Sequence, residues 1–549
     1  MSTKYIFVTG GVVSGLGKGI TAAALGALLK ARGLSVVTQK FDPYINVDTA
    51  LMSPIQHGEK FITEDGAETD LDIGHYERFT DVNLSAESDI TSGMIYQEVI
   101  QREREGYYNG GTVQVVPHII NEIKEHMFKV AREQPTDVVI VEVGGTIGDM
   151  ESTPFIEALR QISYKVGREN CLFIHVTLLP YLNNPGELKT KPTQHSVQKM
   201  LSYGVQPDIL VLRSEHPIND SVRRKVANFC NVKLENVIEN LDMPTVYALP
   251  LYFEKQGFAN AVCKQLQIAQ FVEPDLSSWK LLNEQIQYMT KKIKIALVGK
   301  YVEMQDAYLS CVEAILHASI KHGSDSEIIW IDSDTLEDKT QEELDIIFAE
   351  ADAILIPGGF GPRGMEGMIV AAKYARENRI PFLGLGLGMQ MSVVEIARNV
   401  AGIKDAHSDE CERDCSDIFY YADLTEEEKE NLENIPLTEQ PMRLGAYPMS
   451  IQADTRLAKI YKRTDASERH HHRREFNPAW QGPLLQAGLV FSGTSPDGKL
   501  IEAVEYPEHP FYIGMISHPE FKSRPVRPHP IFAAFIEAAM LYNKNKKNQ

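Results

Sequence analysis

The sequence lacks any long hydrophobic run. No apolar stretch approaches the roughly 20 residues of a membrane-spanning helix, and Met1-Ser-Thr-Lys leads directly into a short strand-like run rather than into a signal peptide. We therefore expect a protein that works in the cytoplasm and does not bind membranes. At 549 residues the chain is also too long for one ordinary core, which predicts two large domains.

Positive charge and cysteine are also scarce. The 55 Lys and Arg against 75 Asp and Glu give a formal net charge of -20, so nonspecific binding to nucleic acid is not expected, and any polyanionic ligand needs a local basic pocket. The six cysteines are scattered, which is typical of reduced thiols rather than of a disulfide framework. Cys411 and Cys415 lack the second pair that would complete a zinc site.

Short apolar runs alternate with helical stretches in two separate series. The first series includes residues 5–8, 34–37, 138–141, 172–176 and 209–212 and fades after Gln270, and a second series begins at Ile293. Such alternation is typical of parallel sheets covered by helices. We therefore predict an α/β protein with domains at residues 1–270 and 293–549, joined by a linker at 271–292 that contains a polar helix.

A glycine-rich loop follows the first predicted strand. Residues 9–19 read Thr-Gly-Gly-Val-Val-Ser-Gly-Leu-Gly-Lys-Gly and precede a helix, so backbone N–H groups and Lys18 could face phosphate oxygens. The loop departs from the strict P-loop pattern, because Val12 replaces the first glycine and Gly19 replaces the Ser or Thr that holds magnesium. The alternative is a glycine turn without a ligand.

Acidic and basic residues follow that suit a nucleotide. Glu142 ends a buried strand and Asp72 closes an acidic segment, and carboxylates beside a phosphate loop suit a magnesium ion. The earlier acids Glu64 and Asp65 fit a solvated loop equally well. Lys189 and Lys191 lie one residue apart in a later loop, where they could neutralise a triphosphate.

The second domain contains an elbow without a nucleophile. Residues 381–390 read as a buried strand, a tight turn and a helix, with Gly386 at the turn where such an elbow holds Cys or Ser. Downstream, His518 and Glu520 are the residue types that activate and orient a nucleophile. The sequence therefore has a catalytic triad without its first member.

Several long motifs resemble those of CTP synthases. They include Gly-Gly-Val-Val-Ser in the glycine-rich loop, residues 40–46, 52–59, 65–72, 74–79, 113–118 and 189–195, and the later segments 357–361, 388–390 and 518–520. The resemblance covers nearly the whole chain. It implies a P-loop-like parallel-sheet synthase domain followed by a class I glutamine amidotransferase domain of flavodoxin-like fold.

The resemblance also implies an activity. In this family, ATP phosphorylates O4 of UTP, ammonia displaces the phosphate at C4, and the glutaminase domain supplies the ammonia through an internal tunnel. Magnesium and ATP are the implied cofactors, with GTP as an effector. Homotetramers that can stack into filaments are the implied assembly.

Individual residues acquire roles through the same resemblance. Catalytic roles fall on Lys18 and Lys40, which would steady the γ-phosphoryl group, and on His518 and Glu520. ATP would bind at Gly15, Leu16, Gly17, Lys18, Gly19, Asp72 and Asp242, and magnesium at Asp72 and Glu142. UTP or CTP would bind at Ser14, Asp149, Glu151, Lys189, Lys191, Gln194, Lys225 and Phe229. A remnant glutamine pocket would comprise Gly359, Leu387, Gly388, Met389, Gln390, Glu410 and Arg473.

The departures from the family pattern define the functional question. Leu385 and Gly386 replace an Ile-Cys pair, so no γ-glutamyl thioester can form. Gly15 replaces a usual Ser, and Thr49-Ala-Leu51 replaces Pro-Gly-Thr near the expected phosphate and ammonia-entry region. Several clustered changes indicate natural loss of the glutaminase rather than an engineered one.

Three hypotheses follow. The first is a ligase that uses free ammonia or another small amine. The second is a noncatalytic nucleotide-binding partner or filament subunit of a normal CTP synthase, and the third is a ligase with a different nucleotide or amine. His470, His471 and His472 do not predict a metal site, because consecutive side chains diverge and Arg473 and Arg474 would repel a cation.

Overall fold

The computed structural model describes residues 3–47, 49, 52–184, 186–268, 272–411, 415–422 and 440–547. The chain forms two compact units. The first comprises Met1–Thr49 with Asp72–Asn283, and the second comprises Ala50–Leu71 with Glu284–Gln549. No helix in the described ranges has the length and apolar character to cross a membrane.

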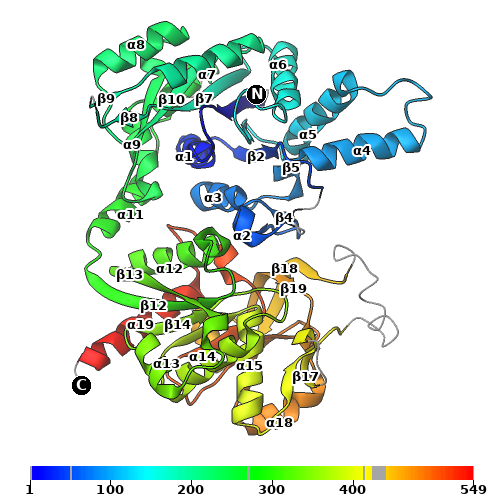
Figure 1. Ribbon diagram of the computed structural model, residues 1–549, viewed down its shortest axis with the longest axis vertical. Helices are drawn as coiled ribbons and strands as arrows, with labels where there is room; N and C mark the ends of the chain where they lie inside the picture. The colour runs from blue at the N-terminus through cyan, green and yellow to red at the C-terminus, as the bar shows by residue number, and fades with distance from the viewer. Residues whose placement is uncertain are drawn as a thin grey trace. The chain divides into compact units, whose positions relative to one another are not determined.

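The first unit is built on a seven-stranded parallel sheet. Its strand order is β11-β10-β7-β1-β6-β2-β5. Figure 1 labels β10, β7, β2 and β5 of this sheet. The strands are β1 Lys4–Gly10, β2 Val36–Asp42, β5 Asp89–Thr91, β6 Val138–Val143, β7 Cys171–Leu178, β10 Ile209–Ser214 and β11 Val237–Leu241. The α/β class is confirmed. β2 begins two residues later than predicted and runs to Asp42, because its buried polar residues Thr38, Gln39 and Lys40 hid the strand pattern.

Helices of the first unit pack against this sheet and against one another. They are α1 Lys18–Lys30, α3 Leu71–Thr80, α4 Ser92–Arg104, α5 Ile120–Glu133, α6 Thr153–Val166, α7 Lys191–Ser202, α8 Asp220–Cys230, α9 Leu249–Lys255, α10 Phe258–Gln265 and α11 Ser277–Gln287. A small hairpin, β8 Tyr181–Leu182 and β9 Glu187–Leu188, precedes α7. The helix predicted in the linker is α11. Its Trp279 is buried within 5.5 Å of the Phe79 ring, so α11 docks on the first unit.

The second unit contains a nine-stranded mixed sheet. Its order is β13-β12-β14-β15-β23-β22-β21-β18-β19. The strands are β12 Lys291–Gly299, β13 Ser324–Asp332, β14 Ala353–Ile356, β15 Phe382–Leu385, β18 Arg443–Ile451, β19 Asp465–His472, β21 Val490–Thr494, β22 Ile501–Glu505 and β23 Tyr512–Met515. β16 Ala406–Ser408, β17 Ser416–Tyr420 and β20 Glu475–Phe476 form a separate three-stranded sheet.

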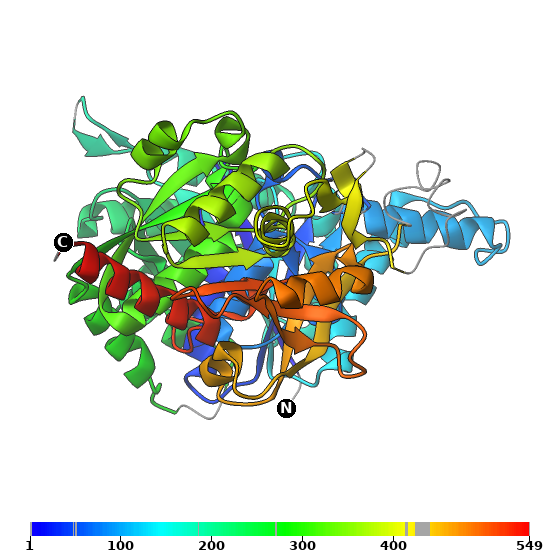
Figure 2. The ribbon, with the colours of Figure 1, turned by 90° about the horizontal axis from the view of Figure 1, so that it is seen from below.

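Apolar side chains form two cores in this unit. One includes residues of α13 Gln341–Ile347, α14 Met365–Glu377, α15 Leu387–Asn399 and α18 Gln481–Gln486. The other includes residues of α12 Leu309–His322, α17 Arg456–Tyr461 and α19 Pro530–Lys547. In Figure 2, α19 is the red helix beside the chain end marked C. The sheet therefore has helices on both faces, with β15 and β23 side by side at its centre.

Residues 52–71 pack with the second unit, although we expected them in the first domain. This segment holds α2 Pro54–His57 and the hairpin of β3 Phe61–Ile62 and β4 Glu68–Thr69. The Glu59 carboxylate accepts hydrogen bonds from the N–H and hydroxyl of Ser310, at the start of α12. Arg469, fully buried on β19, pairs with Glu64 at 3.1 Å. These long-range polar contacts explain why the segment belongs to the second unit.

Candidate active sites

The glycine-rich loop leaves the carboxyl end of β1 in the centre of the first sheet. A Cβ atom at Gly10 would lie 2.6 Å from Cδ of Lys18, and one at Gly11 would lie 1.7 Å from Oγ of Ser196. Lys18 Nζ donates to the carbonyl oxygen of Gly145 at 3.0 Å. Both glycines are therefore required by close packing, and the lysine side chain lies back over the end of the strand.

The loop backbone adopts conformations that few residues tolerate. Val12 has φ of 87°, and Gly15 and Gly17 have φ of 71° and 78°. A β-branched residue with positive φ is rare, and such conformations cluster at functional sites. Gly15, which departs from the family pattern, suits its backbone better than the usual Ser would. Because Val13, Ser14 and Gly15 are exposed, the loop is accessible to a ligand.

Three charged side chains meet beside this loop. Lys40, 6% exposed on β2, lies 2.7 Å from Oδ2 of Asp72 and in register with Glu142 on β6. A Cβ atom on Gly19 would lie 2.3 Å from Oδ1 of Asp72 and 3.2 Å from Oε2 of Glu142. Two carboxylates thus converge over the first turn of α1, and any side chain at position 19 would displace them.

The two carboxyl groups differ in their pKa values. Burial opposes ionisation of Asp72, but the neighbouring Lys40 holds its pKa below the usual range. Burial and the charge of Asp72 raise the pKa of Glu142 to about 7. The Tyr76 hydroxyl, which the sequence did not identify, donates to Glu142. This pair of oxygen donors fits a hard divalent cation such as Mg²⁺, whose charge would favour ionisation of Glu142.

A buried histidine connects the loop to the predicted UTP region. His175 on β7 lies 2.8 Å from Oγ1 of Thr9 and 2.8 Å from Oγ of Ser196 on α7. Burial and the charge of Lys18 lower the pKa of His175 to about 3, so the ring is neutral. It orients α7, which carries Lys191 and the buried Gln194. The sequence offered no signal for His175, because it lies inside an apolar strand.

The remaining predicted nucleotide residues lie outside this cluster. Asp149 accepts from the N–H of Thr146 at 3.1 Å, and Glu151 is exposed nearby in sequence. Lys189 pairs with Glu187, and Asp242 pairs with Arg213. Lys225 and Phe229 are exposed one turn apart on α8. Their nucleotide-binding roles therefore stay predictions. Ala50 and Leu51, part of the departure at 49–51, lie outside the described residues.

The elbow of the second unit has the predicted form. β15 ends at Leu385, Gly386 has φ of 53° and ψ of -116°, and α15 begins at Leu387. The N–H of Gly386 donates to the carbonyl oxygen of Met515 on β23 at 2.8 Å. This sharp strand-to-helix turn is the geometry of a nucleophile elbow, retained here around a glycine.

His518 and Glu520 lie beside the elbow. Nδ1 of His518 is 2.8 Å from Oε1 of Glu520, and the N–H of His518 donates to the carbonyl oxygen of Arg469 at 2.7 Å. A Cβ atom on Gly386 would lie 2.9 Å from Nε2 of His518. The three predicted triad positions therefore come together, with an imidazole aimed at a residue that has no side chain.

The predicted glutamine pocket converges on the loop after β14. Glu410 accepts from the N–H of Gly361, and the Arg473 guanidinium lies 5.5 Å from the Phe360 ring centre. Gly359 faces Lys300 and Leu387. Burial lowers the pKa of Lys300, which sequence reasoning missed, to about 8. Gly388, Met389 and Gln390 are buried in the first turn of α15.

The three consecutive histidines on β19 do not form one site. Each meets its own carboxylate: His470 with Glu502 at 2.6 Å, His471 with Glu68 at 2.7 Å and His472 with Glu475 at 2.9 Å. Successive residues of a strand point to opposite faces, so His471 points away from His470 and His472. The side chains therefore diverge as the sequence indicated, and they serve as partners of buried acids.

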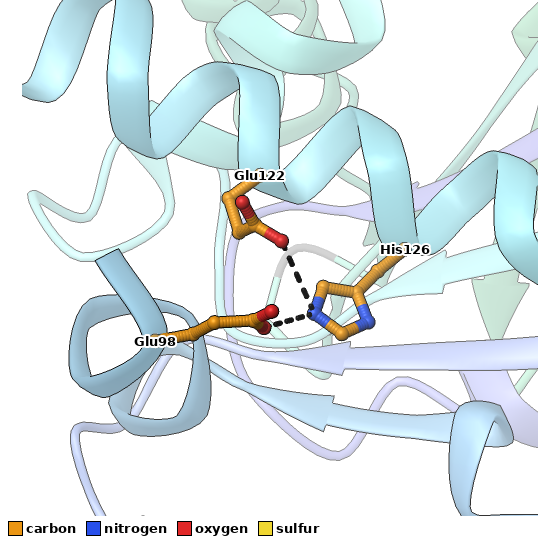
Figure 3. Close-up of side chains that lie close together, drawn as sticks. All are labelled: Glu98, Glu122 and His126. Carbon is orange, nitrogen blue, oxygen red and sulfur yellow. Dashed lines mark hydrogen bonds and ion pairs between the residues drawn. The ribbon is translucent and has the colours of Figure 1, made fainter. Parts of the chain in front are cut away.

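One group of side chains in the described ranges has the composition of a metal site. Glu98 of α4 and Glu122 and His126 of α5 place one ligand atom each within 4.8 Å of one another (Figure 3). However, Arg102 donates to both Glu98 and Glu122, and His126 also contacts Glu87, which pairs with Lys129. Because cations already balance these acids, the cluster is an ion-pair network.

Comparisons with known proteins agree with this architecture. The family model "CTP synthase N-terminus" matches residues 4–268, and "Glutamine amidotransferase class-I" matches residues 303–538. The chain is 52% identical over 539 residues to a CTP synthase of Clostridium perfringens, strain SM101, covering 98% of this chain and 99% of the relative.

Two further matches are of the same kind. A CTP synthase of Caldanaerobacter subterraneus is 53% identical over 537 residues, covering 98% of each chain. A solved Trypanosoma brucei structure, titled CTPS glutaminase domain with bound acivicin, is 35% identical with a TM-score of 0.41 and covers 45% of this chain and 93% of its own.

Proposed function

The chain belongs to the CTP synthase family, and from this premise we propose that it converts UTP to CTP with ATP, Mg²⁺ and free ammonia. ATP would phosphorylate O4 of UTP, and ammonia would then displace the phosphate from C4. The protein would act as a cytoplasmic ligase of pyrimidine biosynthesis. A homotetrameric, filament-forming assembly and GTP as an effector belong to the same proposal.

The contrast between the two sites carries the proposal. In the first unit, Lys18, Lys40, Asp72 and Glu142 are all present, and three of them are in direct contact or register. In the second unit, Gly386 occupies the elbow and offers no atom that could attack glutamine. The groups suited to the ligase reaction are thus present in the first unit, whereas the glutaminase reaction lacks its nucleophile in the second.

The residues of the first cluster suit phosphoryl transfer. Catalysis of this reaction consists mainly of positioning and of neutralising charge on the transferring group. Lys18 and Lys40 would face that charge, and Asp72 and Glu142 would hold Mg²⁺, which neutralises phosphate oxygens when bound. Lys40 would exchange its present contact with Asp72 for the phosphoryl oxygens as the metal enters.

The second site would not hydrolyse glutamine. A glutaminase of this class needs a thiolate that forms a thioester, with His518 as its base and Glu520 orienting the imidazole. Glu410, Arg473 and Gly359 could still recognise an amino acid, but binding without a thiolate releases no ammonia. Nitrogen would therefore come from solution.

A direct assay tests this proposal. The purified chain is incubated with ATP, Mg²⁺ and UTP, and either ammonium chloride or glutamine is added while CTP is measured by chromatography. We expect CTP with ammonium and none with glutamine. CTP from glutamine would refute the loss of the glutaminase. UTP-stimulated ATP hydrolysis without CTP would favour a different amine, and absence of nucleotide binding would reject all the nucleotide-dependent hypotheses.

A further inference from the structure

A small cavity adjoins the elbow within the second unit. It has a volume of about 80 Å³ and is lined by residues of the 54–60 segment, of the loop after β12, of the short helix Gln305–Tyr308 and of α12, by residues of the loop after β14, and by His471, His518, Glu520 and Phe521. A cavity of this size holds a few water-sized molecules, since one water needs about 10–15 Å³ by the same measure. It therefore suits a small ligand.

His518 is one of the residues that line this cavity, and a Cβ atom on Gly358, another lining residue, would lie 3.4 Å from its Nε2. In a neutral ring whose Nδ1 hydrogen is donated to the Glu520 carboxylate, Nε2 is an acceptor. His518 is only 6% exposed, and its Nε2 has no hydrogen-bond partner among the described residues. A buried acceptor without a partner destabilises the folded protein. The ring stacks on Phe521 and covers Gly386, and a ligand with an N–H group would supply the missing donor.

The charges around the cavity favour a cation. Glu59 and Glu520 contribute carboxylates, and Cys311 interacts with Glu520. Lys60 lines the cavity too, and its charge acts on the Glu68 carboxylate and on His471. Burial lowers the pKa of His471 and keeps that ring neutral. The described lining therefore has two acids against one base.

Aromatic rings complete the lining. Tyr301, Tyr308, Phe360 and Phe521 border the cavity, and aromatic faces attract ammonium-type cations. A carboxylate-bearing ligand would be repelled by Glu59 and Glu520. A small cation with N–H donors would satisfy Nε2, a carboxylate and the rings together.

We propose that this cavity binds ammonium and that His518 deprotonates it. The N–H bond of NH₄⁺ breaks, its electron pair remains on the nitrogen of the released ammonia, and the proton moves to Nε2. Glu520 stabilises the resulting imidazolium, which later returns the proton to water. This inference rests on the proposed function, in which free ammonia supplies the nitrogen. The dyad left without a nucleophile would thus serve as a base for the substitute nitrogen source.

The central test is the pH dependence of ammonium use by His518→Gln in the full chain. Glutamine retains hydrogen-bonding capacity but cannot take a proton. At pH 7 we expect KM for total ammonium to rise at least about tenfold, which is less than the roughly 100-fold at the low end of a general-base contribution. The difference should shrink at pH 9, where more unprotonated ammonia is present. His322→Gln, a half-buried histidine at the end of α12, is the matched control.

A second variant tests the sign of the charge effect. Lys60→Met removes the lining cation, and we expect KM for ammonium to fall severalfold. Equal KM values for wild type, His518→Gln and Lys60→Met at pH 7 would overturn the proposal, since ammonia would then arrive without the cavity.

Binding can be measured independently of CTP formation. Ammonium chloride should raise the melting temperature of wild type above the value in equal sodium chloride, and His518→Gln should remove this difference. If wild type makes no CTP from ammonium yet shows this stabilisation, the proposed function fails and the ammonium site stands. If CTP forms but no stabilisation or KM effect is seen, the site fails and the function stands.

Discussion

Two strand-to-helix turns, one in each unit, both contain a glycine with positive φ, but they differ in the reactive side chains beside them. β1 enters α1 through Gly17, with φ of 78°, and β15 enters α15 through Gly386, with φ of 53°. Beside the first turn, Lys40 and Asp72 are paired and Glu142 lies next to them. Beside the second, the imidazole of His518 faces a residue with no side chain.

The difference shows which parts of a site depend on the reacting side chain. The elbow is held by the hydrogen bond from Gly386 to Met515 and by close packing of Gly388 against Ile356, so it persists without a nucleophile. The first cluster is different, because its charges compensate one another in a buried place. Loss of one member there would disturb the others.

Removing Lys40 should have the largest effect. Lys40→Met takes away the cation beside Asp72 and Glu142, and we expect CTP formation from ammonium to fall by roughly 100- to 1,000-fold, as for loss of an electrostatic catalytic group. Steady-state rates at saturating Mg²⁺ measure this. The control is Lys264→Met, an exposed lysine paired with Glu235, which should change nothing. A loss below tenfold would contradict the role of Lys40.

Glu142 should make stability depend on pH. Its folded pKa of about 7 lies above the ordinary value of 4.5, so the folded state binds the proton more tightly than the unfolded state. The resulting stabilisation is fully present below pH 4.5 and is lost as pH rises through 7, a change of at most roughly 3 kcal/mol.

This dependence can be measured in melts with EDTA between pH 4.5 and 8. Glu142→Gln should flatten the wild-type decline, and Mg²⁺ at pH 8 should restabilise wild type but not the variant. Glu235→Gln, an exposed substitution, should behave as wild type. If the melting temperature fell with pH equally steeply in wild type and in Glu142→Gln, the raised pKa of Glu142 would be contradicted.

A side chain at the elbow should be more damaging than one at an open glycine. Gly386→Ala forces an L residue into φ of 53° and places Cβ 2.9 Å from Nε2 of His518, so we expect a loss of roughly 2–3 kcal/mol. Gly402→Ala has positive φ but open space around it and should lose only about 1 kcal/mol. Thermal unfolding compares them, and equal shifts would show that His518 does not restrain the elbow.

The smallest effect concerns charges away from both turns. Burial opposes protonation of His126, but hydrogen bonds with Glu87 and Glu98 raise its pKa above 6.5. Its stabilisation is therefore present below pH 6.5 and lost as pH rises through the folded pKa. His126→Gln should cost about 0.5–1 kcal/mol at pH 5.5 and less at pH 8, because the network is partly exposed. A Zn²⁺-dependent rise in melting temperature in wild type would instead indicate a metal site.

Local patterns predicted most of the fold and the two turns. Apolar strands and glycine spacing are short-range signals, so β1, β6, β7, β15 and the elbow could be identified before the structure. Buried polar residues weakened these signals: Lys40 concealed the end of β2, and His175 and Lys300 looked unremarkable beside apolar neighbours. The contact between Glu64 and Arg469, 405 positions apart, has no local signal at all.

The chain crosses between its units at residues 49/50, 71/72 and 283/284, rather than once. Cutting at the last crossing would therefore not yield two self-sufficient halves. A fragment starting at residue 284 would keep its large sheet but would lose the Glu59 acceptor at the start of α12 and would leave Arg469 and His471 buried without Glu64 and Glu68. The second unit is complete only when it includes residues 50–71, which lie in the sequence between two parts of the first unit. The protein is therefore harder to divide into two stable fragments than its two sheets suggest.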